Sequence, residues 1–349
     1  METETEALGR LIRKHLRPFV KRIDAEAYYP DSYLREVGRS GRLSSQGKTE
    51  REVRVSDVRL IERTSEACMT TGFNFWCHLA AATYLRHTAN RYLRETVLPQ
   101  LEGGELLGGT GLSNPLKFYA GLDTLYLQAE PADGGYRIRG KLPMVSNLGE
   151  KHGFGVIASL NEEERIMAFM PCSADGLTLR ERNGYLGLNG SATYACEFDG
   201  VFAPQEWIVA ERVDSFVEKI RPTFVLYQIP LGLGVGAAAI DSIHKAKDRQ
   251  GGCNRYLPMQ AEELAAKLES LRERAYLLAG TDDLAGRWNE LLRLRLAVVY
   301  FALEAVQADM LHWGSAGYVR DSAPSRRLRE AYFLASLTPT VRHLEKLTR

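Results

Sequence analysis

The sequence predicts an α+β protein of several domains, with a small central β-barrel between an N-terminal helical domain and a C-terminal antiparallel helical bundle. Apolar residues at helical spacing dominate residues 1–107 and return after residue 211. Between these parts, short β-like runs alternate with turn signals at intervals of roughly 8–12 residues, which favours a compact barrel or sandwich over a parallel βαβ sheet. We place the three domains at residues 1–108, 109–212 and 213–349.

The composition is that of an ordinary globular protein, with 45% hydrophobic and 26% charged residues among 349. Lys+Arg 45 against Asp+Glu 44 leaves a net charge of +1, which provides no field to steer the protein onto nucleic acid. The 5 cysteines form no C-x-x-C pair and indicate free thiols in a reducing compartment. No apolar run reaches the roughly 20 residues of a membrane span, and the charged start lacks a signal peptide's apolar segment. We therefore expect a cytoplasmic protein with no nucleic-acid partner and no membrane span.

The N-terminal domain begins with an amphipathic helix, because apolar residues between 8 and 20 recur at helical spacing among Arg and Lys. Pro30 begins a short second helix that Gly38 ends. Residues 39–55 are polar and contain Gly and Ser, so we expect an exposed loop there.

A longer apolar helix is expected over residues 58–85. His78 and His87 have no carboxylate or cysteine at convincing ligand spacing. We interpret them as core or surface histidines, and we predict no metal site.

The central domain begins where Gly108–Gly111 interrupts the helices. Its β-like runs include 122–129, 136–139, 155–160, 165–171, 177–181 and 192–198. Asp133-Gly134-Gly135 is a hairpin signal. After this hairpin, Gly140-Lys141 is expected to turn the chain into a second extended piece that ends at Ser146-Asn147, where a hydroxyl and an amide can meet a flat polar ligand.

The C-terminal domain is expected to contain long helices over 224–247, 262–278 and 283–313, and a last helical stretch over 326–347 interrupted near Pro339. Gly232-Leu233-Gly234-Val235-Gly236-Ala237 matches the G-x-G-x-x-A dinucleotide fingerprint. Pro230 precedes it, and no alternating β/α units follow. We therefore interpret these glycines as sites of close helix packing.

Six short motifs occur in a fixed order along the chain: Leu112-Ser113-Asn114-Pro115, Met144-Val145-Ser146-Asn147, Gly187–Ser191, Phe198–Pro204, Gly314–Tyr318 and Arg326–Ala331. In this order they resemble the acyl-CoA dehydrogenase superfamily of flavoproteins. The resemblance spans nearly the whole length of the chain and agrees with the helix–barrel–helix order.

The resemblance implies FAD as cofactor, with FMN or externally reduced flavin as alternatives. By position in the motifs, the implied cofactor-binding residues are Leu112, Ser113, Met144, Ser146, Asn147, Arg249, Gly314, Ser315 and Gly317. Ser146 corresponds to the hydroxyl that reaches flavin N5/O4. Arg221 and Tyr318 are implied substrate contacts. Because the family's FAD tail runs along a partner subunit, the resemblance also implies a homodimer or homotetramer, with a small acyl substrate and an electron-transfer or reductase partner.

The chain departs from the family where the catalytic Glu is expected. Counting from Arg329-Glu330-Ala331, that position is Thr338, whose hydroxyl cannot act as a general base near neutral pH. The family's other base position corresponds to Ile220. Met144 replaces the flavin-covering Trp, and Gly252 replaces the Phe of the R-x-x-F pair, of which only Arg249 remains.

Three functions remain open. The first is a flavin-dependent oxidoreductase acting on an acyl thioester or related substrate by hydride transfer to flavin N5, with Asp321, Glu330 or water as the base. The second is a flavin monooxygenase of the same fold that uses externally reduced flavin and O2, which needs a dry pocket and no α-proton base. The third is a non-catalytic relative that binds flavin or acyl-CoA, or serves as a scaffold subunit.

Overall fold

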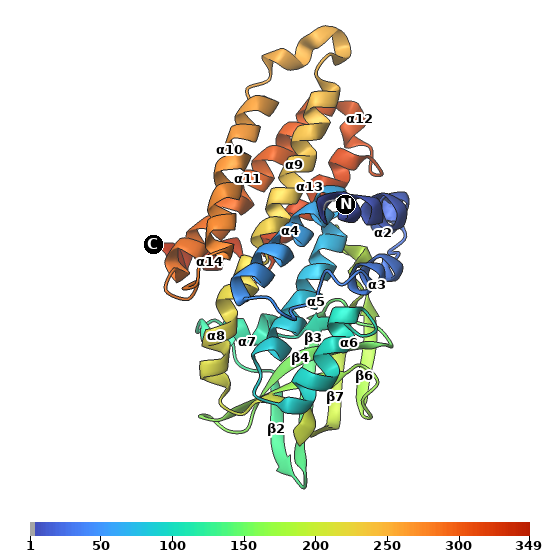
Figure 1. The fold of residues 1–349 in the computed structure, drawn as a ribbon. Helices are drawn as coiled ribbons and strands as arrows, with labels where there is room; N and C mark the ends of the chain where they lie inside the picture. Colours follow the sequence, from blue (N-terminus) through green and yellow to red (C-terminus); the bar gives the residue numbers. More distant parts are fainter. Residues whose placement is uncertain (1–3) are drawn as a thin grey trace.

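Helices occupy both ends of the chain and strands occupy its middle, which confirms the predicted fold class (Figure 1). This computed structural model describes residues 4–349. The N-terminal helices are α1 (Glu4–Leu11), α2 (Val20–Ala25), α3 (Asp31–Arg39), α4 (Glu50–Ala67), α5 (Met69–His87) and α6 (Leu98–Gly103). Every residue of α5 from Met69 to Leu85 is buried. This helix therefore forms the centre on which the sheet and the other helices pack.

Helix α4 begins earlier than the sequence analysis expects. The Thr49 side chain accepts a hydrogen bond from the Glu52 N–H, and the Glu52 carboxylate accepts one from the Thr49 N–H at 2.8 Å. This reciprocal pair is a capping box, which satisfies two backbone donors at the start of a helix. The prediction of a loop over residues 39–55 is therefore wrong at both ends, since α3 extends to Arg39 and α4 begins at Glu50.

The central part is one eight-stranded sheet in the order β6-β7-β3-β2-β4-β5-β8, with β1 parallel to β4. Its strands are β1 (Leu107–Thr110), β2 (Leu127–Ala132), β3 (Gly135–Val145), β4 (His152–Ser159), β5 (Arg165–Pro171), β6 (Leu177–Arg182), β7 (Thr193–Pro204) and β8 (Ile208–Ala210). The predicted hairpin joins β2 to β3, with Ala132 opposite Gly135. Side chains of the sheet, including Phe154 and Phe198, make a hydrophobic core separate from that of the helices.

The predicted turn at Gly140-Lys141 is wrong, because β3 continues through it from Gly135 to Val145. Gly140 has a φ of 127°, and the register with β7 shifts between Ile138 and Gly140. A Cβ at Gly140 would lie 2.3 Å from the Tyr126 carbonyl oxygen, so the close approach requires glycine. The bulge bends the strand without ending it.

The C-terminal helices are α8 (Val213–Leu226), α9 (Ile229–Ala246), α10 (Ala261–Ala279), α11 (Trp288–Trp313), α12 (Ser315–Tyr318), α13 (Ala323–Ser336) and α14 (Val341–Thr348). The glycines of α9 face its neighbours. A Cβ at Gly232 would lie 2.5 Å from Val298 of α11, and one at Gly234 would lie 2.5 Å from the Glu62 carbonyl oxygen of α4. The interpretation of this glycine run as helix packing is therefore confirmed.

One stretch, Val213–Ala246, holds a window that is long and apolar enough to cross a membrane by length and composition, with a mean hydropathy of 1.6. No such run was predicted from the sequence. Inside the fold 89% of that window is buried, which is the burial of a core helix.

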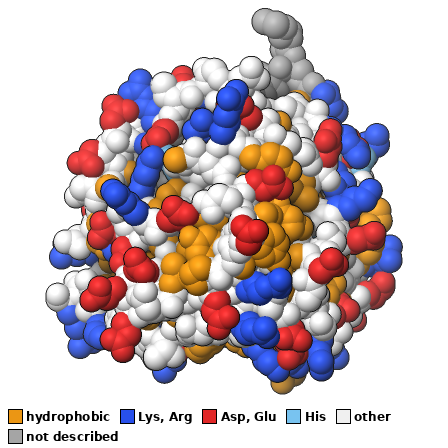
Figure 2. Space-filling view, turned by 90° about the horizontal axis from the view of Figure 1, so that it is seen from below, with side chains coloured by type: hydrophobic (Ala, Val, Ile, Leu, Met, Phe, Trp, Pro, Cys, Tyr) orange, Lys and Arg blue, Asp and Glu red, His pale blue; other side chains and the backbone are white. Residues whose placement is uncertain are grey.

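Strand β1 begins at Leu107, before the predicted division between residues 108 and 109. The three-domain division stays a prediction. At the end of the molecule that carries the sheet, acidic and basic side chains are interspersed around a central group of hydrophobic ones (Figure 2), in keeping with the net charge of +1.

Candidate functional site

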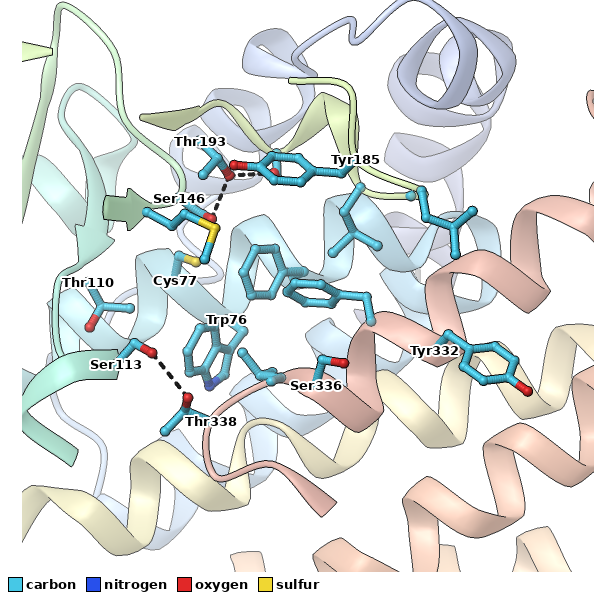
Figure 3. Close-up of a pocket in the computed structure, with 18 of the residues that line it drawn as sticks. Trp76, Cys77, Thr110, Ser113, Ser146, Tyr185, Thr193, Tyr332, Ser336 and Thr338 are labelled. Carbon is cyan, nitrogen blue, oxygen red and sulfur yellow. Dashed lines mark hydrogen bonds between the residues drawn. The ribbon is translucent and has the colours of Figure 1, made fainter. Parts of the chain in front are cut away.

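A cavity of about 480 Å³ lies where the sheet meets the helices (Figure 3). Its lining comes from α5, α8 and α13, from the residues around β1 and α7, from the end of β3, and from the segment between β6 and β7 together with the start of β7. We call the part of the lining with Ser146, Ser191 and Thr193 the hydroxyl wall, and the part with Phe73, Trp76, Phe224 and Phe333 the aromatic wall.

The hydroxyl wall includes a chain of three side chains. The Ser146 Oγ lies 2.7 Å from the Thr193 Oγ1, which lies 2.8 Å from the Ser191 Oγ. Each hydroxyl can donate or accept, so the chain can turn a proton toward an acceptor atom of a bound ligand. Ser146 directly follows β3, which ends at Val145, and Val145 pairs with Tyr194 near the start of β7. This pairing brings Ser146 next to Thr193.

A second hydroxyl pair connects α7 to the segment after α13. The Ser113 Oγ and Thr338 Oγ1 lie 3.0 Å apart, and the Gln228 side-chain amide donates to the Thr338 carbonyl oxygen at 2.8 Å. Gln228 is held in turn by the Arg295 guanidinium at 2.9 Å. These contacts fix Thr338 at the edge of the cavity.

The aromatic wall consists of Phe73, Trp76, Phe224 and Phe333. Phe73 stacks on Trp76 with ring centroids 5.4 Å apart, and Trp76 meets Phe224 edge to face at 4.8 Å. The indole N–H of Trp76 donates to the Phe224 carbonyl oxygen at 3.0 Å. None of these four was predicted as a site residue from the sequence, although Phe73 and Trp76 stand three residues apart on one helix face.

No carboxylate or histidine belongs to the cavity lining within the described residues 4–349. The one charged side chain of that lining is Arg329, whose guanidinium donates to both carboxylate oxygens of Asp24 at 2.6 Å. Cys77 also lines the cavity, and burial raises the pKa of its thiol well above the usual value, so the thiol is neutral. The cavity therefore offers hydroxyl groups and apolar surface but no ordinary general base.

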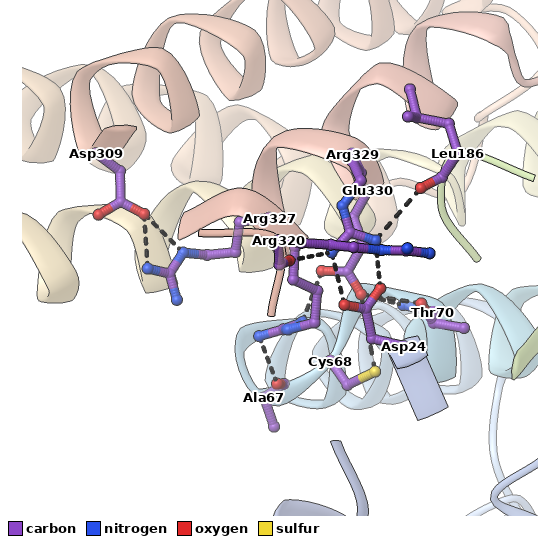
Figure 4. A network of polar contacts seen from close by, with 11 residues as sticks. Asp24, Ala67, Cys68, Thr70, Leu186, Asp309, Arg320, Arg327, Arg329 and Glu330 are labelled. Carbon is purple, nitrogen blue, oxygen red and sulfur yellow. Dashed lines mark hydrogen bonds and ion pairs between the residues drawn. The ribbon is translucent and has the colours of Figure 1, made fainter. Parts of the chain in front are cut away.

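Neither carboxylate that the sequence suggests as a substitute base lies in the cavity. Asp321 is exposed outside it. Glu330 is buried and accepts hydrogen bonds from the Thr70 N–H at 3.0 Å, the Thr70 hydroxyl at 2.9 Å and Arg326 at 2.7 Å (Figure 4). These contacts join α13 to α5, which is a structural role.

Four of the sequence-predicted site residues meet in the cavity: Ser113, Met144, Ser146 and Thr338. Leu112 is buried beside it without lining it. Asn147 points away, because its side chain accepts from the Tyr29 hydroxyl at 2.7 Å and donates to the Gly108 carbonyl oxygen at 2.7 Å. It thereby connects β1 to the segment between α2 and α3.

The remaining predicted residues lie outside the cavity. Arg249 stacks over Trp313, 4.0 Å from the ring centroid; Trp313 ends α11 and is followed by Gly314 and by α12, which contains Ser315, Gly317 and Tyr318. Tyr318 is 84% exposed. Arg221 stacks over Trp288 at 4.9 Å.

No groups of three or more His, Cys, Asp or Glu placed to hold a metal ion occur among the described residues. His78 is buried and accepts a hydrogen bond from the Gly108 N–H at 3.0 Å through Nδ1. Burial lowers its pKa to about 3, so this histidine is a neutral core residue.

Comparison with known proteins shows which of them share this sequence pattern and this fold. No protein-family model matches the chain. An acyl-CoA dehydrogenase of Bacillus subtilis (strain 168) is 24% identical over 344 residues, which cover 91% of this chain and 89% of that protein. The solved structure of a glutaryl-coenzyme A dehydrogenase in complex with glutaryl-CoA has a TM-score of 0.88 over 100% of this chain and 94% of that chain, at 18% identity.

A dibenzothiophene monooxygenase from Paenibacillus sp. A11-2 has the same fold, with a TM-score of 0.81 and 17% identity over 98% of this chain and 95% of that chain. The full-length similarity agrees with the motif order, the sheet between helices and the cavity at their junction. The chain has the fold of the acyl-CoA dehydrogenases and is similar to them in sequence over nearly its whole length.

Proposed function

We propose that this chain is a flavin-dependent oxidoreductase that acts on an acyl thioester or a related small substrate. The observation that carries the proposal is a cavity of about 480 Å³ whose lining combines a hydroxyl wall with an aromatic wall. A flavin bound there would supply the hydride acceptor at N5. An isoalloxazine ring needs hydrogen-bond donors at its polar edge and an apolar face beside it, and the two walls fit these needs.

In this proposal each hydroxyl has a distinct role. Ser146 donates to the ring edge, because its Oγ can accept a hydrogen bond from the Thr193 hydroxyl, whose Oγ1 can in turn accept one from Ser191. Ser113 and Thr338 hold the opposite end of the cavity. The aromatic side chains exclude water from the space left for substrate.

The proposed cofactor is FAD, with FMN as the alternative. Gly314, α12 and Arg249 lie together at one end of the bundle, and the nearby large apolar side chains Leu311 and Tyr318 are 59% and 84% exposed. An exposed apolar group of this kind is typical of a surface covered in an assembly. We propose a homodimer or homotetramer that covers this end, acting in the cytoplasm with an electron-transfer or reductase partner.

A flavin monooxygenase of the same fold is the second candidate. The specific observation in its favour is that the described cavity lining contains no carboxylate, which agrees with the motif-based prediction that Thr338 takes the position of the family's Glu. Dehydrogenation removes an α-proton and needs a base, whereas oxygen chemistry on flavin needs a dry pocket. The solved monooxygenase with this fold is consistent with that chemistry.

The test is a flavin spectrum of the purified protein, followed by anaerobic titration with acyl-CoA thioesters. Bleaching of the flavin supports the oxidoreductase. O2-dependent turnover on supplied reduced flavin, without bleaching, supports the monooxygenase. Protein that neither retains nor takes up flavin contradicts both and leaves the non-catalytic relative.

Two variants test whether residue 338 is the position from which the catalytic base is missing. Thr338→Glu introduces a carboxylate at the cavity edge, and Thr338→Gln has the same size without a base. Acyl-CoA dehydrogenation by the first variant alone would support Thr338 as the vacant base position. Equal activity in both variants, or silence in both while flavin and acyl-CoA still bind, would refute that placement.

A further inference from the structure

A second cavity, of about 280 Å³, is lined by the first turns of α4, the last turns of α5, the segment 94–98 and the end of α8. Its lining shares no residue with that of the first cavity. Four of its lining side chains are cations, Lys48, Arg54, Arg86 and Arg94, and the one anion among the described lining residues is Glu50. The second cavity is therefore a basic one, separate from the cavity assigned to flavin.

Arg86 belongs to a buried network that holds the helices together. Its guanidinium forms ion pairs with Asp57 at 2.9 Å and with Glu102 at 3.0 Å. The Tyr227 hydroxyl also donates to Asp57, at 2.7 Å. Two carboxylates neutralise Arg86, so the capacity of this cavity to attract an anion comes from its other cations.

Arg54 is 6% exposed and retains donor capacity toward the cavity. Its Nε donates to the Ala279 carbonyl oxygen at 3.1 Å, and its Nη2 donates to the Thr281 carbonyl oxygen. Its Nη1 lies 3.6 Å from the Glu50 carboxylate, which is beyond hydrogen-bond distance, and the Glu50 side chain is 69% exposed. A buried guanidinium with an unfilled nitrogen can donate to a bound anion.

Thr223 presents a second buried polar group to the same cavity. It is 8% exposed, and its hydroxyl makes no hydrogen bond with any residue between 4 and 349. Buried hydroxyl groups in proteins are nearly always hydrogen-bonded, so one without a protein partner indicates that water or a ligand completes the site.

The outer part of the lining carries two exposed cations, Lys48 and Arg94. Neither lies within ion-pair distance of a carboxylate of the described chain. Arg94 donates to the Thr88 carbonyl oxygen at 3.3 Å, which leaves its charge uncompensated. Two unpaired cations at the mouth of a cavity attract anions and can hydrogen-bond them after entry.

The charges of the cavity do not cancel. The four lining cations face three carboxylates, those of Glu50, Asp57 and Glu102, which leaves a net charge of +1. Burial lowers the pKa of His87, which keeps this lining residue neutral, and the Lys219 ammonium lies close enough to lower that pKa further. Lys219 adds a second net positive charge to the surroundings.

We propose that this basic cavity binds the phosphate group of a small organic phosphate. A phosphate monoester carries a charge of about −1.5 to −2 at pH 7, which matches the excess of cations, and guanidinium groups match its oxygen geometry. Pockets for drug-sized ligands span about 300–1,000 Å³, so a cavity of about 280 Å³ suits a compact ester. Val53 and Leu98 offer apolar surface to its carbon atoms. This inference does not depend on the proposed function.

The test is isothermal titration calorimetry of the full-length protein with glycerol 3-phosphate at constant ionic strength, with glycerol as the uncharged control. We expect saturable binding of the ester and none of glycerol. Higher salt should weaken the binding, because it screens the exposed cations. Protein with and without flavin should bind the ester equally, since the two cavities share no lining residue.

Variants locate the binding. Lys48→Gln and Arg94→Gln should each weaken it about tenfold, the effect of losing one hydrogen bond between charged groups. Arg91→Gln is the matched control, because it removes the same charge three residues before Arg94 and Arg91 does not line the cavity. Thr223→Val keeps the shape of the side chain without its hydroxyl and should weaken binding about fivefold.

Three outcomes would overturn the inference: no saturable binding of glycerol 3-phosphate by the wild-type protein, equal effects of Arg91→Gln and Arg94→Gln, or unchanged affinity in both Lys48→Gln and Thr223→Val. Competition between flavin and the ester would refute the separation of the two sites. A protein that binds the ester and no flavin would contradict the proposed function and leave the phosphate site standing.

Discussion

The ion pair between Arg326 and Glu330 permits a sharp stability prediction. Both side chains lie on α13 at a spacing of four residues, 2.7 Å apart, with exposures of 9% and 1%. Glu330→Gln removes the charge while keeping the shape, and it leaves the Arg326 guanidinium buried without a counter-ion. Removing one partner of a buried pair costs about 3–5 kcal/mol, so we expect the free energy of unfolding to fall by that amount.

The chain offers a matched control in Arg91 and Glu95. They have the same spacing of four residues and an N···O distance of 2.8 Å, but exposures of 83% and 52%. Exposed pairs of this kind contribute about 0.3–0.5 kcal/mol. Glu95→Gln should therefore change stability by less than about 0.5 kcal/mol.

Urea-induced unfolding followed by circular dichroism compares the two variants with wild type. A third variant, Arg326→Met combined with Glu330→Gln, removes both charges and should recover part of the loss, because no uncompensated ion remains. A loss below about 1 kcal/mol for Glu330→Gln, or no difference from Glu95→Gln, would refute the buried-charge argument. A folded Glu330→Gln protein that loses only turnover would instead return Glu330 to the list of candidate bases.

Two further predictions concern the core. Burial lowers the pKa of His78 to about 3, whereas the unfolded chain has the ordinary value of about 6.5. Its contribution to stability is therefore complete above pH 6.5 and is lost as pH falls toward 3, at about 1.4 kcal/mol per pH unit. The side-chain oxygen of Asn in His78→Asn can still accept the hydrogen bond from the Gly108 N–H. In urea unfolding measured as a function of pH, this variant should reduce the slope of the unfolding free energy against pH by the equivalent of one proton. An unchanged slope would contradict the lowered pKa of His78. Gly234→Ala places a Cβ 2.5 Å from the Glu62 carbonyl oxygen and should cost about 1–3 kcal/mol, whereas Gly103→Ala, with nothing within 4 Å, should not destabilise; equal effects would contradict the packing argument.

The layout of the fold was predictable because hydrophobic period and turn signals act locally. The helix–sheet–helix order and the β2–β3 hairpin follow from such patterns. The start of α4 was also predictable, since Thr49 and Glu52 stand at capping-box spacing. The polar composition of residues 39–55 favoured a loop instead. The continuation of β3 through Gly140 was not, because a bulge depends on the register of neighbouring strands.

The site was predictable only in part, for a related reason. Motif position identified Ser113, Ser146 and Thr338, which the fold brings together from three distant segments. Motif position also selected Asn147, but its side chain points away from the cavity, toward Tyr29, which is 118 residues away in the sequence. The aromatic wall depends on contacts between α5, α8 and α13, and no local pattern shows that Trp76 and Phe224 meet.

The surroundings of Thr338 bear on whether a carboxylate could work there. Arg295 is fully buried, donates to Gln228 and to the Leu334 carbonyl oxygen at 3.0 Å, and its Nη1 has no partner among the described residues. Gln228 in turn binds the Thr338 carbonyl oxygen, so an uncompensated cation lies one side chain behind this position. Burial would raise the pKa of a glutamate at residue 338, and the nearby guanidinium would lower it. Because these effects oppose each other, the carboxylate that Thr338→Glu introduces has electrostatic support for its charged form. If this variant binds flavin and still shows no dehydrogenation, the absent carboxylate is not what separates this chain from the dehydrogenases.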